Sequence, residues 1–269
     1  MTSLDLGYHR RHRQAGGECP PQPLPGQLRG PSVQVLAQLG GKYHSASMPR
    51  MTLRSMPLTP ELYDYLVAHS APRDTVLSQL AEETAASFPD AAGMQIGPEQ
   101  GTFMTLLAQL TGASRALEIG TFTGYSSICI ARGLAEGGHL TCCDVSAEWT
   151  AVARKYWEMA GLANQIDLQL RPALETVRAM PAGETFDFAF IDADKTGYVS
   201  YWDEVVPRIR PGGLILVDNT LSHGRVVDRT STSAAVQAIR DFNDHAVADG
   251  RVVVVLLPVG DGLTLARKR

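Results

Sequence analysis

The sequence lacks any apolar run that approaches the roughly 20 residues needed to span a membrane as a helix. Its first residues are rich in Arg and His and contain no apolar segment of the kind found in secretory signals. Cysteine is scarce, with four residues in 269, and no cysteines have the spacing of a metal site. These absences favour a reduced, cytoplasmic protein that has no membrane partner.

The net charge of most of the chain is negative. Residues 1–55 contain seven Lys and Arg against two Asp and Glu, whereas the remaining 214 residues contain 17 against 26. A nucleic-acid groove needs clustered basic residues, so an acidic body argues against a nucleic-acid partner. Residues 1–47 are also rich in Pro and Gly and accumulate no apolar face. We therefore expect a flexible basic tail over 1–47 and one folded domain over 48–269.

Strands and helices alternate from residue 115 onward. Short apolar runs predict strands at 116–119, 140–144, 166–170, 186–191 and 214–218. Helical spacing between and after them predicts helices at 126–134, 147–160, 173–179, 198–209 and 234–248. Three further helices, near residue 60, over 73–86 and from residue 97, precede the sheet and are expected to cover one side of it.

The end of the chain departs from this alternation. Two strands are expected at 252–257 and 263–266, and the tight turn Gly260–Gly262 joins them into a hairpin at an edge of the sheet. The whole pattern predicts an α/β fold: a Rossmann-like, doubly wound, mostly parallel seven-stranded sheet. Helices are expected on both faces, and the C-terminal edge strand is expected to be antiparallel.

Polar residues follow two of the apolar runs where each run stops. Asp192 follows one strand, Asp218 and Asn219 end the next, and Lys195 comes three residues after Asp192. Ligands of doubly wound sheets bind beyond the carboxyl ends of the strands. Grouped there, these oxygen atoms would suit Mg²⁺, Ca²⁺ or Mn²⁺. The alternative is that Asp192 and Asp194 merely cap the next helix, and these residues alone do not decide between the two.

The first strand-to-helix turn contains Gly120 and Gly124. Their spacing, Gly-x-x-x-Gly, differs from the fingerprint of dinucleotide-binding proteins, and Glu118 beside the turn would repel a phosphate but accept from an ammonium group. Asp144 ends the second strand, where an acidic residue accepts the hydroxyls of a ribose. An ordinary glycine turn and a helix cap are the alternatives. Together the positions favour a ligand that has a ribose, no phosphate and a cationic amino-acid end.

Four ordered segments, Glu118–Ser126, Asp192–Lys195, Asp218–Leu221 and Pro258–Gly262, resemble one known family. This is the family of metal-dependent class I O-methyltransferases, which includes catechol and caffeoyl-CoA O-methyltransferases. The resemblance extends over about residues 56–269 and does not include 1–47. It implies S-adenosylmethionine as the methyl donor, a divalent metal (Mg²⁺ before Ca²⁺ or Mn²⁺) and a homodimer.

The resemblance also implies roles for individual residues. The positions that match S-adenosylmethionine contacts are Met94, Glu118, Gly120, Thr121, Gly124, Tyr125, Ser126, Asp144, Ala173 and Asp192. The matching metal ligands are Asp192, Asp218 and Asn219. Lys195 matches the catalytic base, acting with Asp192, and the substrate contacts match Lys195, Asn219 and Asp261. A structural ion pair with Asp192 or Asp194 is the alternative for Lys195.

The sequence departs from the family pattern in two places. Ser222 and His223 stand where many members carry Trp after the Asp-Asn-Thr-Leu segment. The stretch just before the Leu62–Tyr65 segment, Leu58–Pro60, includes no Lys, although the plant caffeoyl-CoA enzymes have one there. We therefore expect methylation of one hydroxyl of a small vicinal dihydroxy aromatic, a catechol. The alternatives are a caffeoyl-CoA-like thioester as substrate, or a non-catalytic cofactor-binding protein.

Overall fold

The computed structural model describes residues 56–72, 74–181, 183 and 185–269. The tail expected over 1–47 and the domain boundary expected at residue 48 lie outside these residues. Leu58–Arg269 forms one compact unit. Among the described residues, none of the helices is both long and apolar enough to cross a membrane.

One seven-stranded sheet forms the centre of this unit, with the strand order β3-β2-β1-β4-β5-β7-β6. The strands are β1 Arg115–Ile119, β2 His139–Asp144, β3 Ile166–Leu170, β4 Phe186–Ile191, β5 Ile209–Val217, β6 Val252–Leu257 and β7 Leu263–Lys268. Neighbours among β1 to β5 are parallel, whereas β7 runs antiparallel to both β5 and β6. The predicted doubly wound sheet with an antiparallel hairpin at its edge is confirmed. Within the hairpin, the C-terminal strand β7 is the inner strand and β6 forms the edge.

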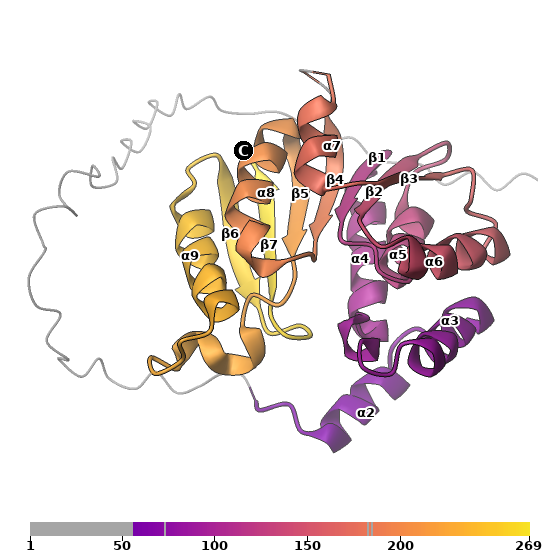
Figure 1. Ribbon diagram of the computed structural model, residues 1–269, viewed down its shortest axis with the longest axis horizontal. Helices are drawn as coiled ribbons and strands as arrows, with labels where there is room; N and C mark the ends of the chain where they lie inside the picture. The colour runs from indigo at the N-terminus through magenta and orange to yellow at the C-terminus, as the bar shows by residue number, and fades with distance from the viewer. Residues whose placement is uncertain (1–55, 73, 182, 184) are drawn as a thin grey trace, which may run out of the picture. The chain divides into compact units, whose positions relative to one another are not determined.

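Helices cover both faces of the sheet, as predicted (Figure 1). One face packs against α3 Thr75–Ser87, α4 Pro98–Leu110, α5 Tyr125–Gly133 and α6 Ala147–Met159. The other face packs against α7 Ala173–Ala179, α8 Tyr198–Val205 and α9 Ala234–Ala248. The helix α2, Pro60–Ala68, buries none of its residues and lies against α4. Four short 3₁₀ segments complete the described elements: η1 Ala92–Met94, η2 Lys195–Gly197, η3 Val206–Arg208 and η4 Ser222–Val227.

The strand β4 shows why its sequence is almost continuously apolar. Phe188 and Phe190 are buried against the α3–α6 face, whereas Ala189 and Ile191 are buried against the α7–α9 face. Successive side chains of a strand point to opposite faces, so a strand covered on both sides needs apolar residues at consecutive positions. Burial of each large side chain contributes about 1.5–3 kcal/mol, which favours this central position.

The start of β5 differs from the prediction. The helix α8 ends at Val205 rather than near Ile209, and β5 begins at Ile209 rather than Leu214. The strand passes through Gly212, which has φ +83°, and its pairing with β4 shifts register at this point. A Pro-Gly-Gly sequence usually indicates a turn, but here the glycines allow a bulge inside the strand.

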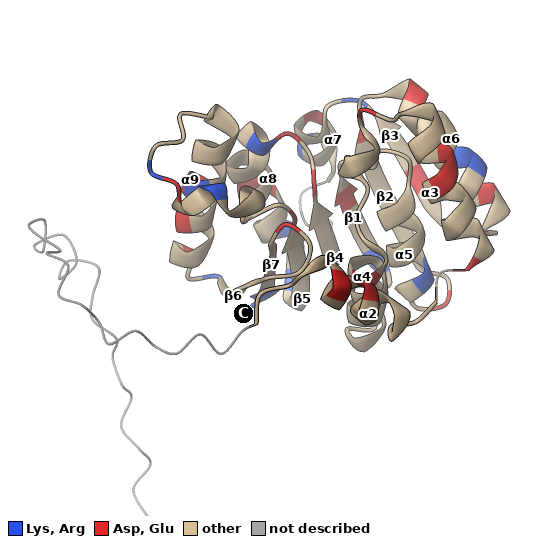
Figure 2. Ribbon diagram, turned by 90° about the horizontal axis from the view of Figure 1, so that it is seen from below, with Lys and Arg blue, Asp and Glu red and all other residues tan. Residues whose placement is uncertain are grey.

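The helices α3 and α6 are joined by charged side chains. Figure 2 shows acidic residues on α3 beside basic and acidic residues on α6. Lys155 on α6 forms an ion pair with Glu83 on α3, and the Tyr156 hydroxyl donates to the same carboxylate at 2.8 Å. These contacts fix α6 against α3, so the turn that leads from β2 into α6 has a defined position.

Candidate active site

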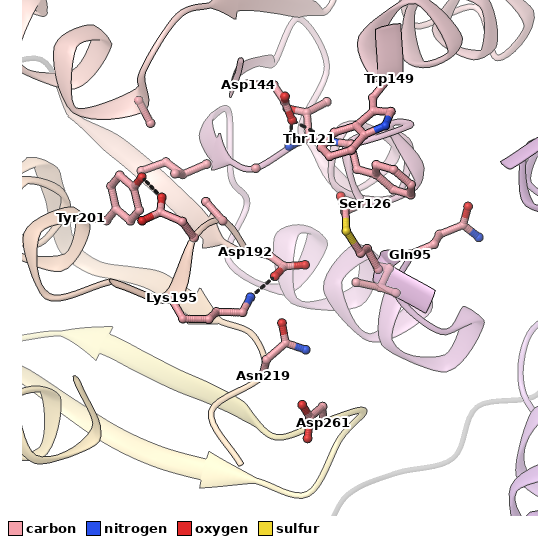
Figure 3. Close-up of a pocket in the computed structure, with 18 of the residues that line it drawn as sticks. Gln95, Thr121, Ser126, Asp144, Trp149, Asp192, Lys195, Tyr201, Asn219 and Asp261 are labelled. Carbon is pink, nitrogen blue, oxygen red and sulfur yellow. Dashed lines mark hydrogen bonds and ion pairs between the residues drawn. The ribbon is translucent and has the colours of Figure 1, made fainter. Parts of the chain in front are cut away.

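A cavity of about 740 Å³ lies at the carboxyl ends of the parallel strands (Figure 3). The turns after β1, β2, β4 and β5 line it, together with the segment before α4 and the turn between β6 and β7. The chain winds outward from β1 to β3 and then returns to β4 on the other side of β1. Crevices of doubly wound sheets form at such a reversal, because the connections leave in opposite directions.

The turn after β1 is organised by Asp144, at the end of β2. One carboxylate oxygen of Asp144 accepts from the backbone N–H groups of Thr121 and Phe122, both at 2.9 Å. The other oxygen accepts from the backbone N–H groups of Val145 at 2.7 Å and Ser146 at 2.8 Å. Asp144 does not cap α6, because Ser146 does so by accepting from the N–H of Trp149 at 3.2 Å. The helix-cap alternative for Asp144 is therefore wrong.

This end of the cavity combines an aromatic wall with unpaired polar atoms. The rings of Phe122 and Trp149 meet edge to face, with 5.1 Å between centroids, and both residues line the cavity. The side-chain oxygens of Gln95 and Thr121 also lie there, buried and without a hydrogen-bond partner in the described part of the chain. Buried polar atoms normally have partners, so the pair suits a ligand that brings hydrogen-bonding groups.

Lys195 belongs to a hydrogen-bonded chain in the middle of the cavity (Figure 3). Its Nζ donates to Asp192 Oδ1 and to the Tyr198 hydroxyl, each at 2.8 Å. The Tyr198 hydroxyl in turn donates to the backbone carbonyl of Asp218 at 3.1 Å. Burial raises the pKa of Tyr198 well above its ordinary value, so this hydroxyl remains a donor. The ion pair that the sequence left open for Lys195 exists, and it places Nζ beside Asp192 in the cavity.

Asp218 lies just behind this group, with only 3% of its surface exposed. Its Oδ2 accepts from Gln100 Nε2 at 2.8 Å, and its Oδ1 accepts from the backbone N–H of Asn219 at 2.6 Å. Burial, and then the charge of Asp192, raise the pKa of Asp218 to about 7. A bound cation would relieve the destabilisation of the Asp218 charge that burial and the neighbouring carboxylate cause.

The residues present fit the predicted divalent metal. The proposed ligands lie at the ends of the neighbouring strands β4 and β5 and are Asp192, Asp218 and Asn219. They provide carboxylate and amide oxygens, which Mg²⁺ and Ca²⁺ prefer as ligands. No group of three or more His, Cys, Asp or Glu side chains in the described residues has the arrangement of a metal site. The predicted metal site contains only two such side chains, Asp192 and Asp218, and its third ligand is the amide of Asn219.

The far end of the cavity is formed by the segment after β5. Asn219, Ser222, His223 and Gly224 all have positive φ, so the chain turns sharply there. The imidazole of His223 is 76% exposed, and its Nδ1 lies 2.8 Å from Asp261 Oδ2. His223 and Asp261 both line the cavity, and Figure 3 shows Asp261 beyond Asn219. His223 is thus an exposed residue and also a neighbour of the predicted substrate position Asp261.

The structure brings most of the predicted site residues together. Those that line the cavity are Met94, Gly120, Thr121, Tyr125, Ser126, Asp144, Ala173, Asp192, Lys195, Asn219 and Asp261. Glu118, Gly124 and Asp218 are not among the lining residues. A Cβ at Gly124 would come within 2.8 Å of the Trp157 indole nitrogen, so this glycine allows α5 to pack against α6. The spacing of the motif predicted where the turn lies, but it did not indicate which residues of the turn face the cavity.

Glu118 is fully buried beneath the turn, although the resemblance places it at the cofactor. It is the residue before the last of β1, so its side chain points to the α3–α6 face rather than out of the strand end. Its Oε2 accepts from the Ser127 hydroxyl at 2.5 Å and from the Cys142 thiol at 3.2 Å. Burial raises the pKa of Glu118 to about 7, against the hydrogen bonds of Ser127 and Ser126.

This raised pKa predicts a pH-dependent contribution of Glu118 to stability. The folded pKa of about 7 exceeds the ordinary glutamate value of 4.5. The contribution is therefore fully present below pH 4.5 and is lost as the pH rises through about 7. We expect Glu118→Gln, which stays neutral, to gain stability relative to the natural protein by up to about 3 kcal/mol between pH 5 and pH 8. Urea unfolding of both proteins at the two pH values measures this, and an identical difference at both would contradict it.

Several residues of the site were not identified from the sequence. Trp149 and Gln95 line the cavity, and Gln100 contacts Asp218 behind it. Trp149 had a usable signal, because an aromatic residue in the first turn of the helix after Asp144 must lie near the strand end. Gln95 and Gln100 precede the sheet in the chain, and no local pattern connects them with strand ends that follow much later.

The comparison with known proteins decides the family. The family model described as O-methyltransferase matches residues 67–269. The chain belongs to this O-methyltransferase family. The probable caffeoyl-CoA O-methyltransferase 2 of Dictyostelium discoideum is 39% identical over 211 residues, which cover 77% of this chain and 91% of that protein. Catechol O-methyltransferase domain-containing protein 1 of Mus musculus is 37% identical over 217 residues, which cover 78% of this chain and 82% of that protein.

Solved structures agree with this membership. The O-methyltransferase from Bacillus cereus, in complex with SAH, has a TM-score of 0.71 and 34% identity, and the match covers 77% of this chain and 96% of that one. TomG from Streptomyces achromogenes, in complex with SAM, has a TM-score of 0.71 and 30% identity, with 77% and 96% covered. The predicted family and enzyme class, an S-adenosylmethionine-dependent O-methyltransferase, are confirmed.

Proposed function

We propose that this O-methyltransferase methylates one hydroxyl of a small vicinal dihydroxy aromatic, with a divalent metal held by Asp192, Asp218 and Asn219. The observation that carries the proposal is a single cavity with Asp144 at one end, Asp192 in the middle, and Asn219 and Asp261 towards the other end. A methyl donor and its acceptor must lie in contact to react, and one cavity with two chemically different ends provides this.

The charge of the cavity supports S-adenosylmethionine as the donor. Its lining includes two permanently charged basic residues and four carboxylates, those of Asp144, Asp192, Asp194 and Asp261. S-adenosylmethionine carries a sulfonium and an ammonium group, so an excess of negative charge stabilises it. Asp144 would accept from the ribose hydroxyls, and the unpaired oxygens of Gln95 and Thr121 would accept from further donors of the ligand.

The metal site would lie beside Asp192, towards the acceptor end of the cavity. Asp192, Asp218 and Asn219 would hold the divalent ion there, and its positive charge would lower the pKa of a catechol hydroxyl. Asp192 and Asn219 present their side chains at the cavity, and Gln100 holds the Asp218 carboxylate in place with its 2.8 Å hydrogen bond. Ligands fixed by such outer contacts keep their geometry without reorganisation.

Lys195 would handle the proton of the reacting hydroxyl. Its Nζ lies within 2.8 Å of both Asp192 Oδ1 and the Tyr198 hydroxyl, so it is held beside the proposed ligands rather than free in solution. As a general base, Lys195 would accept the hydroxyl proton, and the oxyanion so formed would take the methyl group from the donor. S-adenosylhomocysteine and the methyl ether are the products.

A methyl-transfer assay tests the proposal. Labelled S-adenosylmethionine is incubated with a panel of catechols, first with Mg²⁺ and then with EDTA. We expect turnover that EDTA removes and added Mg²⁺ restores. A monohydroxy aromatic of the same size is the control, because it cannot chelate. Turnover that persists in EDTA would show that methyl transfer does not need the metal. Turnover of a CoA thioester, but of no free catechol, would show that the substrate is a thioester.

Asp144 provides a test of the donor end by itself. We expect Asp144→Ala to weaken S-adenosylmethionine binding by roughly 1.5–3 kcal/mol, the scale for hydrogen bonds to a charged group. The variant also loses the four backbone hydrogen bonds that organise the turn. Calorimetric titration measures the affinity, and Asp144→Asn, which keeps one oxygen, should give an intermediate value. Unchanged affinity in Asp144→Ala would exclude the ribose contact.

A further inference from the structure

The segment after β5 and the turn between β6 and β7 form one rigid wall at the acceptor end of the cavity. The N–H of Leu221 donates to the carbonyl of Asp261 at 3.0 Å, and the N–H of Thr220 donates to that of Gly262 at 2.9 Å. A Cβ at Gly262, which has φ +89°, would come within 2.6 Å of the Leu221 backbone nitrogen. The two segments therefore approach as closely as backbone allows, and the side chains they carry have defined positions.

Three basic side chains line the cavity, and two of them lie beside a carboxylate. Lys195 pairs with Asp192, and His223 pairs with Asp261. Arg225 is the third. Within the described residues, no carboxylate pairs with Arg225, and its guanidinium makes one hydrogen bond, from Nε to the carbonyl of Ser222 at 3.1 Å. Arg225 thus lines the cavity with two terminal nitrogens that have no hydrogen-bond partner among the described residues.

The position of Arg225 is fixed by a second arginine. The Nε of Arg240, on α9, donates to the carbonyl of Val226 at 2.9 Å, and its Nη2 donates to the carbonyl of Arg225 at 3.1 Å. The same Nη2 also donates to the carbonyl of Asp228. The backbone around Arg225 is held by these three bonds and its Nε by Ser222. Ligand binding therefore costs less conformational entropy than it would for a free arginine side chain.

The neighbouring part of the lining is apolar. Ala235 and Ile239, on successive turns of α9, contribute small and aliphatic side chains to the cavity. An aromatic ring suits such a surface, whereas a second charged group does not. An acceptor that fits both features has an aromatic body and one anionic substituent.

We propose that Arg225 binds a carboxylate of the acceptor, so that the preferred substrates are catechols that carry a carboxylic acid. A guanidinium binds a carboxylate through two parallel N–H···O hydrogen bonds, and both Nη groups of Arg225 are available for this. The inference rests on the proposed function and adds the substrate class to it. Arg225 is then a specificity-determining residue, and it contributes to binding rather than to methyl transfer itself.

Three acceptors and three variants test this. The acceptors are a dihydroxybenzoic acid, its methyl ester and unsubstituted catechol, which share the hydroxyl pair and differ in the anion. The variants are Arg225→Gln, Arg225→Lys and Arg229→Gln. Arg229 is exposed on the same loop and does not line the cavity, so Arg229→Gln makes the same charge change away from it. Thermal melting checks that every variant folds.

The expected result is a loss of discrimination. The natural protein should prefer the acid over the ester by at least about tenfold in kcat/KM. Arg225→Gln should lower kcat/KM for the acid by about 10–100-fold, through KM, and leave the ester and catechol within about twofold, since hydrogen bonds to a charged group have this magnitude. Arg225→Lys should retain part of the preference, because it keeps the charge and loses the planar pair of donors. Arg229→Gln should retain all of it.

Other outcomes overturn the inference in distinguishable ways. Equal turnover of acid and ester by the natural protein, or an equal loss for both in Arg225→Gln, would leave the proposed function standing and remove the role of Arg225. A CoA thioester can be added as a further acceptor. If it is preferred over the acid, and Arg225→Gln lowers kcat/KM for the thioester alone, the anion that Arg225 binds is a phosphate rather than a carboxylate. Failure to methylate any of the three acceptors in Mg²⁺ would overturn the proposed function and this inference together.

Discussion

Asp218→Asn is expected to lower Mg²⁺-dependent methyl transfer by at least about 100-fold while leaving S-adenosylmethionine binding largely intact. The substitution keeps the shape of the side chain and its place beside Gln100, but it removes a charged oxygen from the proposed ligand set. Asp218 does not line the cavity where the donor would bind, so that end should be unaffected. Calorimetric titration of Mg²⁺ and of S-adenosylmethionine, each into the same protein, separates the two effects from the reaction rate.

Asp167→Asn is a matched control for this experiment. Asp167 is exposed on β3 and does not line the cavity, so the same chemical change there should alter neither affinity. If Asp218→Asn lost affinity for Mg²⁺ and S-adenosylmethionine equally, the residue would be structural. If it bound Mg²⁺ as well as the natural protein does, Asp218 would not be a ligand.

Gly120→Ala is expected to destabilise the protein by about 3 kcal/mol or more and to abolish binding of donor and metal together. A Cβ at Gly120 would lie 1.9 Å from the backbone carbonyl oxygen of Asp192, and that oxygen cannot rotate away as a side chain would. The clash separates the ends of β1 and β4, between which Asp192 is held by its N–H bond to the Ile119 carbonyl at 2.8 Å. Urea unfolding and the same two titrations measure the effects.

Gly137→Ala separates this clash from ordinary backbone strain. Gly137 has φ +73°, close to the φ +90° of Gly120, but a Cβ added there would have nothing within 4 Å. An alanine there should cost only about 1–2 kcal/mol, the penalty for a left-handed conformation, and should not affect binding. Similar losses of stability at the two glycines would show that strain alone explains Gly120→Ala.

Much of the fold could be predicted because its strands and helices show clear local patterns of apolar residues. The runs at β3, β4 and β6 and the helices α7 and α9 were predicted with the boundaries that the structure has. Such elements begin and end where apolar residues meet polar ones, which is a local signal. The prediction failed at β5, where Gly212 and Gly213 resemble a turn and are in fact part of the strand. Pairing with β4 and β7 overrides the local preference there.

Part of the site could be predicted for the same reason. Asp144, Asp192 and Asn219 each follow or end a parallel strand, and parallel strands end at the same edge of a sheet. Gln100 could not be found in this way, because its partner Asp218 lies 118 positions further along the chain. The divalent metal, the catechol substrate, the homodimer and the cytoplasmic location stay predictions.

The sequence by itself determined the strands, the doubly wound fold class and the acidic residues at the strand ends, because these depend on local patterns of apolar and polar residues. Only the tertiary structure decided which side chains face the cavity: it buried Glu118 beneath the turn and paired His223 with Asp261. It also left Arg225 as the lining base without a carboxylate partner among the described residues. Pairing depends on contacts between segments far apart in the chain, so no local pattern could have indicated it.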